Sequence, residues 1–347
     1  MENAVKKENF AYLSFTERGR ELANRLCTVT GGRADFAGKG GVSLRQWTEE
    51  QFAACDVLVF VGAVGICVRA IAPFIRNKTI DPAVLCIDEG GNFVIPLLSG
   101  HLGGANAVAR RLAALCSAVP VITTATDLNG VFAVDLWAKA QNLAVVNPER
   151  IKSVSSKILS GQEIQICCPW PVSGTVPDRV TLSEEGDVAV GFHDTERKKL
   201  LLAPKTGALG IGCRKNIMPQ QLEEAFLRFC AERKLLAESV STAATIDLKA
   251  SEPGLLEFIN RHGWPLKTYS AGELAAVPGS FTASPFVEKT TGVDNVCERA
   301  SVLACSGELL EKKYACGGVT FAFAAAPPEL NWRTDDGEVD HSGHRPG

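Results

Sequence analysis

The stretch that decides the fold is Val57–Arg111, VLVFVGAVGICVRAIAPFIRNKTIDPAVLCIDEGGNFVIPLLSGHLGGANAVARR. Apolar, strand-like runs lead into two glycine-rich turns, GAVG at Gly62–Gly65 and SGHLGGAN at Ser99–Asn106, and each turn runs into a helical pattern. Such a turn directs backbone N–H groups and the positive end of a helix toward a carboxylate or a phosphate. Neither turn matches the GxGxxG or GxxxxGK(S/T) fingerprint, so the predicted anion site belongs to another kind of ligand.

The pattern around this stretch predicts an open doubly wound sheet. Short apolar runs rich in β-branched residues, typical of buried parallel strands, are found at 10–15, 56–63, 83–88 and 119–124. Helical patterns separate them at 17–27, 68–75 and 104–118. In a sheet of this class the ligand binds at the carboxyl ends of the strands. Because the glycine-rich turns follow strands, we expect them at that edge.

The whole chain is predicted to be of the α/β class, with two doubly wound, open-sheet α/β domains joined by a small α/β middle module. The N-terminal domain is expected at 1–126, the middle module at 127–205 and the C-terminal domain at 206–327. Residues 328–347 are polar and rich in residues that break regular structure, so a disordered tail is expected there.

Composition excludes several classes of function. The 347 residues are 46% hydrophobic and 22% charged, as in ordinary globular proteins, and the net charge of -3 offers no bulk basic field for nucleic acid. The apolar runs are too short to span a membrane, and the N-terminus lacks a secretory signal, so a cytoplasmic protein is expected. The twelve cysteines are scattered without a CxxC motif, which favours buried reduced thiols over disulfides or a metal site.

The turn SGHLGGAN offers the leading candidates for catalysis and binding. His101 carries a side chain that titrates near neutral pH and could act as an acid or a base, although a histidine in a turn is more often a structural hydrogen-bonding group. Gly100, Gly103 and Gly104 allow the backbone to approach a ligand closely. Asn106 could contact the ligand or simply cap the following helix.

Other candidates follow neighbouring strands. Arg69 lies about one helical turn beyond the GAVG motif and could bind a carboxylate in a bidentate manner, or be solvated or paired with an aspartate. Asp88 in DEGG could be a base, but the first position of a β-turn is the more common role for such an aspartate. Asp127, in TTATD after Thr124, could be a base or a helix cap.

In the C-terminal domain, the predicted strand in TIDLK places Asp247 and Lys249 on one side, because side chains alternate along a strand. The two could orient an acidic substrate group or form a surface ion pair of little energetic value. Residues 288–291 are predicted to form a turn before a helix at 292–307, with Asn295 on the first face of that helix. This helix entry is a further predicted anion site.

Six segments resemble the cobalt-precorrin 5A hydrolase family of the anaerobic cobalamin (vitamin B12) pathway. They are VGAVGICVRAIAPF, DEGGNFVIPLLSGHLGGANAVARRLA, VITTATD, LGIGCRKN, TIDLKASEPGLLEF and FVEKTTGVDNVCERA. The resemblance extends from about Phe10 to Ala325. It implies an enzyme that opens the ring A δ-lactone of a cobalt-containing macrocycle with water and releases acetaldehyde, which gives cobalt-precorrin 5B.

The resemblance also implies the ligand and the roles of individual residues. The substrate is an anionic tetrapyrrole that brings its own cobalt, so neither a cofactor nor a metal held by the protein is expected. Transient contact with neighbouring methyltransferases of the pathway is expected. The catalytic candidates are, in order, His101, Asp127 and Asp88. The predicted substrate-binding residues are Gly62, Gly65, Arg69, Ser99, Gly100, Gly103, Gly104, Asn106, Thr124, Lys249, Glu288, Lys289, Thr290, Thr291 and Asn295.

Two other classes of function stay open at this point. A non-catalytic carrier that binds and protects a corrinoid intermediate would need the same glycine-rich turns as the enzyme. A nucleotide-dependent oxidoreductase is disfavoured, because the dinucleotide fingerprint is missing. Serine-histidine-aspartate catalysis is also disfavoured, since the chain has no GxSxG motif and water suffices as the nucleophile.

Overall fold

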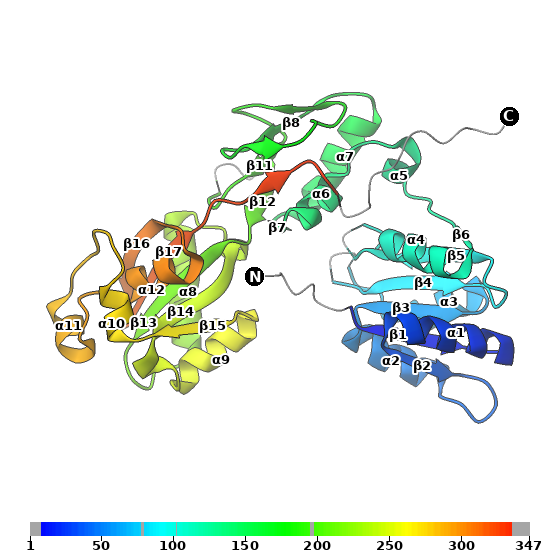
Figure 1. Cartoon of the computed structure of the whole chain (residues 1–347), viewed down its shortest axis with the longest axis horizontal. Helices are drawn as coiled ribbons and strands as arrows, with labels where there is room; N and C mark the ends of the chain where they lie inside the picture. Colours follow the sequence, from blue (N-terminus) through cyan, green and yellow to red (C-terminus); the bar gives the residue numbers. More distant parts are fainter. Residues whose placement is uncertain (1–7, 78–79, 102, 195–197, 335–347) are drawn as a thin grey trace. The chain divides into compact units, whose positions relative to one another are not determined.

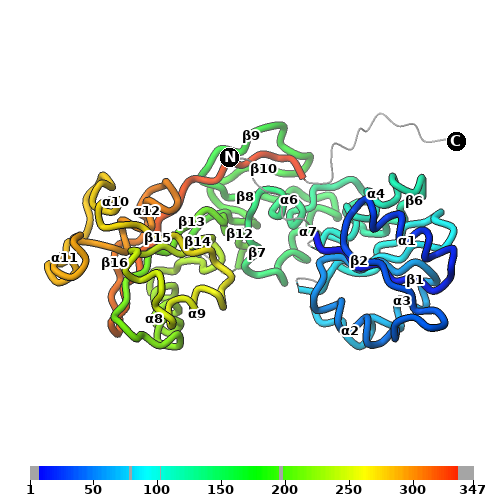
Figure 2. The backbone as a smooth tube through the Cα atoms, turned by 60° about the horizontal axis from the view of Figure 1, so that its bottom comes forward, coloured from blue at the N-terminus to red at the C-terminus, as the bar shows by residue number. Residues whose placement is uncertain are grey.

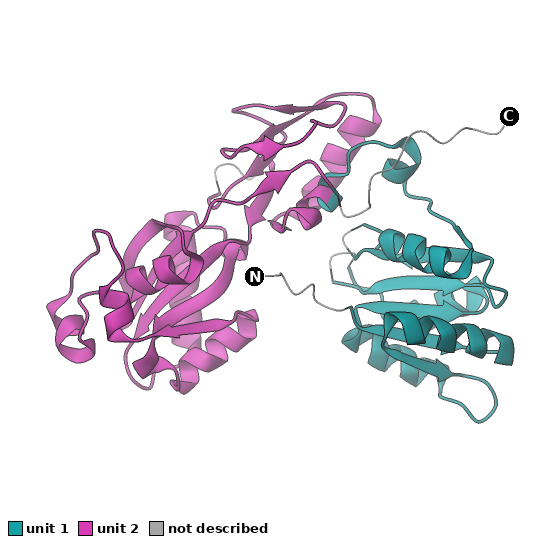
Figure 3. Cartoon of the chain, in the orientation of Figure 1, with its two compact units in different colours: residues 1–136, 334–347 teal, residues 137–333 magenta. Residues whose placement is uncertain are grey.

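The computed structural model describes residues 8–77, 80–101, 103–194 and 198–334. The chain separates into two compact units, and each is described by itself (Figure 3). Unit 1 contains the described residues up to Leu136 together with Thr334, and unit 2 is Trp137–Arg333. Residues 137–205 of the predicted middle module and the predicted C-terminal domain therefore belong to one compact unit, although each region has its own sheet, whereas residues 127–136 belong to unit 1.

Unit 1 is built on a six-stranded sheet in the order β2-β1-β3-β4-β5-β6 (Figure 1). Its strands are β1 Phe10–Ser14, β2 Arg33–Phe36, β3 Val57–Val61, β4 Ala83–Ile87, β5 Phe93–Leu98 and β6 Val119–Pro120. Its longer helices are α1 Glu17–Thr30, α2 Leu44–Ala54, α3 Val64–Ile71 and α4 Ala105–Cys116. α1 and α4 pack on one face through side chains such as Leu26 and Leu112, and α2 and α3 pack on the other through Trp47 and Ile71. Helices on both faces confirm the predicted doubly wound architecture.

The strands do not all run in the same direction. β1 to β4 are parallel, whereas β5 is antiparallel to β4 and β6 is parallel to β5. Only residues 88–92 join β4 to β5, and a parallel crossover needs a dozen or more residues. The carboxyl ends of β5 and β6 therefore lie beside the amino end of β4.

This reversal corrects the prediction that the glycine-rich turns share one edge. GAVG and Asp88 follow β3 and β4, so they lie at one edge of the sheet, while SGHLGGAN and Asp127 follow β5 and β6 at the opposite edge. The predicted strand at 119–124 is also shorter than expected, because only Val119–Pro120 pairs as the edge strand β6.

Unit 2 contains two five-stranded sheets in the orders β10-β8-β11-β12-β7 and β15-β14-β13-β17-β16. The strands of the first are β7 Leu143–Val145, β8 Ile164–Cys167, β10 Val180–Leu182, β11 Val188–Val190 and β12 Leu200–Pro204. The strands of the second are β13 Gly207–Cys213, β14 Val240–Ile246, β15 Leu266–Tyr269, β16 Glu308–Cys316 and β17 Val319–Ala325. β16 and β17 form an antiparallel hairpin, and both Gly317 and Gly318 have the positive φ that its tight turn requires.

Helices cover both faces of the C-terminal sheet, as the two views of the chain show (Figures 1 and 2). Phe226 and Phe258 place α8 and α9 on one face, and Leu274 and Ala300 place α10 and α12 on the other. The helices of unit 2 are α6 Val134–Ala140, which begins in unit 1, α7 Ile151–Leu159, α8 Pro219–Arg233, α9 Pro253–His262, α10 Ala271–Ala275, α11 Pro285–Thr291 and α12 Cys297–Cys305. In the described ranges no helix is both long and apolar enough to cross a membrane.

Two local predictions for the C-terminal domain were wrong. The strand predicted to continue through TIDLK ends at Ile246, and Asp247–Lys249 forms a single 3-10 turn. The helix predicted at 292–307 is interrupted: residues 288–291 already belong to α11, and α12 begins only at Cys297. Both misreadings arose where a polar turn continues an apolar pattern.

The prediction of a disordered tail was wrong for residues 328–334, whereas 335–347 lie outside the described residues. Leu330–Asn331 forms β18, which pairs with β9 (Val172–Ser173) of the middle region. The Trp332 ring stacks on Trp137 with 5.3 Å between the ring centres. Because the tryptophans bury large apolar surfaces, this segment gains enough contact to be ordered.

Candidate active site

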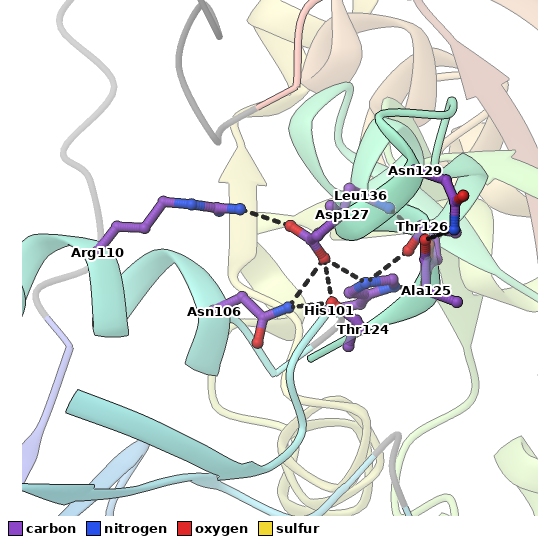
Figure 4. A network of polar contacts seen from close by, with 10 residues as sticks. His101, Asn106, Arg110, Thr124, Ala125, Thr126, Asp127, Asn129 and Leu136 are labelled. Atoms are coloured by element: carbon purple, nitrogen blue, oxygen red, sulfur yellow. Dashed lines mark hydrogen bonds and ion pairs between the residues drawn. The ribbon is translucent and has the colours of Figure 1, made fainter. Parts of the chain in front are cut away.

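The predicted residues that the structure brings together lie around His101, in the turn between β5 and α4. The His101 ring lies between two carboxylates from different helices. Its Nε2 contacts Oδ2 of Asp127 in α5, Ala125–Asn129 (Figure 4), and the two atoms are 3.1 Å apart. Its Nδ1 is 3.1 Å from Oδ2 of Asp135 in the first turn of α6. The side chains of His101, Asp127 and Asp135 are only 18%, 9% and 7% exposed, so solvent screens these contacts weakly.

The glycines of the turn are explained by its own geometry. Gly104 precedes α4 with a φ of 82°, a conformation that other residues adopt at a cost. A Cβ on Gly103 would lie 2.3 Å from the Cβ of Ser99. Ser99 in turn donates from its hydroxyl to the backbone oxygen of Asp81 at 2.9 Å, next to the start of β4. Packing therefore accounts for these residues, and ligand contact at Ser99, Gly100, Gly103 and Gly104 stays a prediction.

Asp127 accepts hydrogen bonds from several sides. Asn106 donates from Nδ2 at 3.1 Å, Arg110 from Nη2 at 2.5 Å, and the Thr124 hydroxyl also donates. Burial alone would raise the pKa of Asp127, but the bonds from Thr124, Arg110 and His101 outweigh it and lower the pKa below its usual value. Asp127 is therefore a carboxylate whose lone pairs are already used, which makes it a poor free base in this state.

His101 is set up as a proton donor. The hydrogen bond to Asp135 is the largest cause that raises the pKa of His101; burial opposes it, and Asp127 adds to the increase. A carboxylate oxygen can only accept, so the contacts with both aspartates are hydrogen bonds only if both ring nitrogens carry a hydrogen. The cations His101 and Arg110 then balance the two aspartates. The network favours an imidazolium, so His101 is better suited to act as an acid than as a base.

Three members of this network were missed by the sequence analysis: Arg110, Thr126 and Asp135. Arg110 could have been found, because it lies four positions after Asn106 and therefore on the same face of α4. Thr126 has its hydroxyl 3.0 Å from Nε2 of His101. Asp135 gave no local signal, since it is 34 positions from His101 along the chain. The predicted capping role of Asn106 was wrong, because α4 begins at Ala105 and the amide of Asn106 reaches Thr124 and Asp127 instead.

Asp88 and the GAVG residues lie at the other edge of the sheet and take no part in this network. Asp88 accepts hydrogen bonds from the backbone N–H groups of Gly90, Asn92 and Phe93 at 3.1, 2.8 and 2.6 Å, and from the Asn92 amide at 2.8 Å. These contacts match the turn role and make Asp88 a weak candidate for the base. Arg69 donates to the backbone oxygen of Gly65 at 3.3 Å, and its binding role stays a prediction together with those of Gly62 and Gly65.

In unit 2 the expected pair of Asp247 and Lys249 does not form. Lys249 donates to Oε2 of Glu252 at 3.1 Å, whereas Asp247 accepts the N–H of Leu248 at 2.7 Å. Asn295 is almost fully buried, where it donates to the backbone oxygen of Thr282 at 2.9 Å.

The remaining predicted residues of unit 2 are in α11. Thr290 and Thr291 donate to the backbone oxygens four residues earlier in α11, at 2.7 and 2.8 Å. Glu288 and Lys289 are exposed. None of these contacts tests substrate binding, so the binding roles of Lys249, Glu288, Lys289, Thr290, Thr291 and Asn295 stay predictions.

Comparison with family models defines the class of the protein. Residues 46–127 match the model described as Cobalamin synthesis G N-terminal, 132–205 match Cobalamin biosynthesis central region, and 208–324 match Cobalamin synthesis G C-terminus. The three matches follow one another in the order of the three larger sheets. The chain is thus a three-region α/β protein of the cobalamin synthesis G class.

Individual relatives narrow this class. A cobalt-precorrin-5A hydrolase from Salmonella typhimurium is 32% identical over 93% of this chain and 99% of its own length. One from Priestia megaterium is 31% identical over 91% of this chain and 88% of its own. The chain belongs to the cobalt-precorrin-5A hydrolase family, and it is an enzyme. A solved structure from Sulfolobus solfataricus, described as a cobalamin biosynthesis protein G homolog, is 21% identical with a TM-score of 0.38 and covers 92% of this chain and 97% of that one.

Proposed function

We propose that this enzyme hydrolyses cobalt-precorrin-5A: water opens the ring A δ-lactone, and acetaldehyde is released to leave cobalt-precorrin-5B. The observation that carries the proposal is the sequence identity of 32% and 31% to two proteins named cobalt-precorrin-5A hydrolase, over 93% and 91% of this chain. The network around His101 supports it, because the reaction needs a buried group that can give and take a proton.

The chemistry places the same oxygen atom at the centre of both steps. In the first step water adds to the lactone carbonyl, the bond from that carbon to the ring oxygen breaks, and the ring oxygen leaves with a proton. The added water becomes part of the new carboxyl group and gives up a proton to the solvent. In the second step this oxygen, now a hydroxyl, loses its proton as its carbon becomes the aldehyde. The carbon–carbon bond to the macrocycle breaks, and the macrocycle keeps the electron pair. One acid–base group beside this oxygen is therefore enough for both transfers.

His101 is the residue we assign to this role. As an imidazolium it donates a proton to the leaving ring oxygen, and as the resulting imidazole it takes the proton back from the hydroxyl. Asp127 and Asp135 stabilise the protonated ring and keep it in place. The sequence left His101 as an acid or a base; this assignment makes it the acid in the first step and the base in the second, and it leaves Asp88 without a role in the reaction.

The proposal needs neither a cofactor nor a metal held by the protein, because the cobalt and the electron sink both arrive with the substrate. The protein has a net charge of -3, so it has no overall positive field to attract the anionic tetrapyrrole. The peripheral carboxylates of the substrate would therefore be bound locally, by N–H groups and a few cations. A cytoplasmic location and transient contact with neighbouring methyltransferases stay predictions.

The test is to incubate the purified, chelator-treated protein with cobalt-precorrin-5A without oxygen and to measure acetaldehyde. We expect one acetaldehyde for each lactone consumed, with no added NAD, ATP or divalent ion. Tight binding of the corrinoid without any acetaldehyde would replace the proposal with a carrier function. An absolute requirement for an added cofactor would contradict the proposal that the reaction needs neither a cofactor nor a metal held by the protein.

A further inference from the structure

The two carboxylates that bind His101 differ in what else they contact. Asp127 also accepts from Asn106, Arg110 and Thr124. Asp135 accepts the N–H of Leu136 at 3.1 Å through Oδ1, and within the described residues His101 is the side chain to which its carboxylate is hydrogen-bonded. Loss of His101 would therefore leave Asp127 with three side-chain donors, but it would leave Asp135 as a buried carboxylate without a charged partner.

This difference decides which ring nitrogen is free to react. A substrate oxygen that approaches the imidazolium must replace one of its two carboxylates. Exchanging the contact with Asp127 loses one bond of four, whereas exchanging the contact with Asp135 would strand a charge that is only 7% exposed. The exchange at Nε2 is therefore the less costly one.

We propose that Asp135 is a positioning residue for the hydrolysis: it stays bound to Nδ1 of His101 and keeps the ring protonated and oriented, while the lactone oxygen takes the place of Asp127 at Nε2. This rests on the function proposed above. Within the described residues, the charged groups that contact His101 are Asp127 from α5 and Asp135 from α6, with Arg110 of α4 reaching it through Asp127. Asp135 makes the largest contribution to the raised pKa of His101.

The consequence is a defined pH dependence. The acid form of His101 starts the reaction, so the rate falls as the pH rises through the pKa of His101. Without the charge of Asp135 this pKa is lower, and the fall begins at a lower pH. A residue that only supported the fold would lower the rate equally at every pH.

The experiment compares Asp135→Asn with the wild-type enzyme by single-turnover rate against pH. We expect the falling limb to move by roughly one pH unit or more toward acid, while substrate binding, followed by corrinoid absorbance, changes less than about twofold. Asp135→Glu keeps the charge and should retain the wild-type limb. The matched control is Glu223→Gln, which removes a carboxylate 2.9 Å from Nε2 of His262 in unit 2 and should not move the limb.

Three outcomes would overturn the proposal: a uniform loss of rate without a shift, an equal shift in Asp135→Glu, or a larger shift in Asp127→Asn than in Asp135→Asn. A readout that does not depend on activity separates this inference from the proposed function. The chain has 5 histidines, so the His101 ring can be titrated by NMR in labelled protein. If the pKa of His101 is lower in Asp135→Asn but the wild type releases no acetaldehyde, the proposed hydrolysis is refuted and the contact between Asp135 and His101 is retained. An unchanged pKa would refute the contact itself.

Discussion

The SGHLGGAN turn of unit 1 and the FVEKTTGVDN segment of unit 2 were predicted on similar grounds, yet their polar side chains are used differently. In the first, His101, Asp127 and Asp135 bind one another across separate elements. In the second, Thr291 and Asn295 bind backbone oxygens within or close to their own segment. Titratable groups that bind one another can exchange protons, whereas side chains that bind the backbone mainly hold the chain in place.

A buried carboxylate in unit 2 shows the second kind of use. Glu298 of α12 is fully buried and accepts from the N–H and the hydroxyl of Thr282 at 2.7 and 2.8 Å, and from the N–H of Lys313 at 2.7 Å. It thereby fastens the start of the segment that carries α11 to the edge strand β16. Burial of an acidic residue is thus no sign of catalysis unless its partners can also titrate.

The largest effect that this comparison predicts is for His101→Gln. Without the group that donates and recovers the proton, the single-turnover rate should fall by roughly 10²–10⁴, while corrinoid binding persists. A suitable control is His193→Gln, because His193 also pairs with a carboxylate, Glu311 at 2.9 Å, but lies in unit 2. An unchanged rate for saturated His101→Gln, with a weaker affinity, would reduce His101 to a binding residue.

The next largest effect is expected for Glu298→Ala, which should lower the stability of the protein and leave the rate of the reaction almost unchanged. Three donors lose their acceptor in a site closed to water, so the free energy of unfolding should fall by roughly 2–5 kcal/mol. The rate of the protein that remains folded should stay within about twofold of the wild type. Urea denaturation and a single-turnover assay at low temperature measure the two quantities. A large loss of rate at unchanged stability would remove the distinction drawn between the two regions.

The central strands of the unit 1 sheet could be predicted because their side chains follow a simple apolar pattern. Runs such as Val57–Val61 and Ala83–Ile87 are buried along their whole length, and β-branched apolar residues signal this directly. The direction of β5 was in principle predictable as well, since residues 88–92 are too few for a crossover. The prediction placed both glycine-rich turns at one edge of the sheet because it did not consider the length of the connection between β4 and β5.

The composition of the candidate site could be predicted only in part. His101 and Asp127 stand in conspicuous polar turns after apolar runs. Asp135 stands within an apolar helical pattern, VFAVDLWAKA, where nothing indicates that its carboxylate meets a histidine from a distant turn. Contacts of this kind depend on how segments pack in three dimensions, and local sequence patterns do not encode them.

The smallest effect is expected for Asp88→Asn. Among the described residues, the hydrogen bonds of the Asp88 carboxylate are four and stay within its own turn, so the rate should remain within about twofold of the wild type. Stability at neutral pH should fall by roughly 1 kcal/mol, because an amide offers one acceptor oxygen instead of two and water can replace part of the loss.

The pH dependence of this small difference has a definite sign. Burial raises the pKa of Asp88, but the bonds from Phe93, Asn92 and Gly90 outweigh it, so the pKa in the folded protein lies below its ordinary value. A lowered pKa contributes stability above the pKa of the unfolded chain, and this stability is lost as the pH falls through the folded value. The free energies of unfolding of the wild type and Asp88→Asn should therefore differ at pH 7 and become similar in acid below the folded pKa of Asp88. Urea denaturation in the two conditions measures this. A variant that is equally stable at both but slower by 10² or more would instead return Asp88 to the catalytic residues and refute the assignment of the reaction to the opposite edge of the sheet.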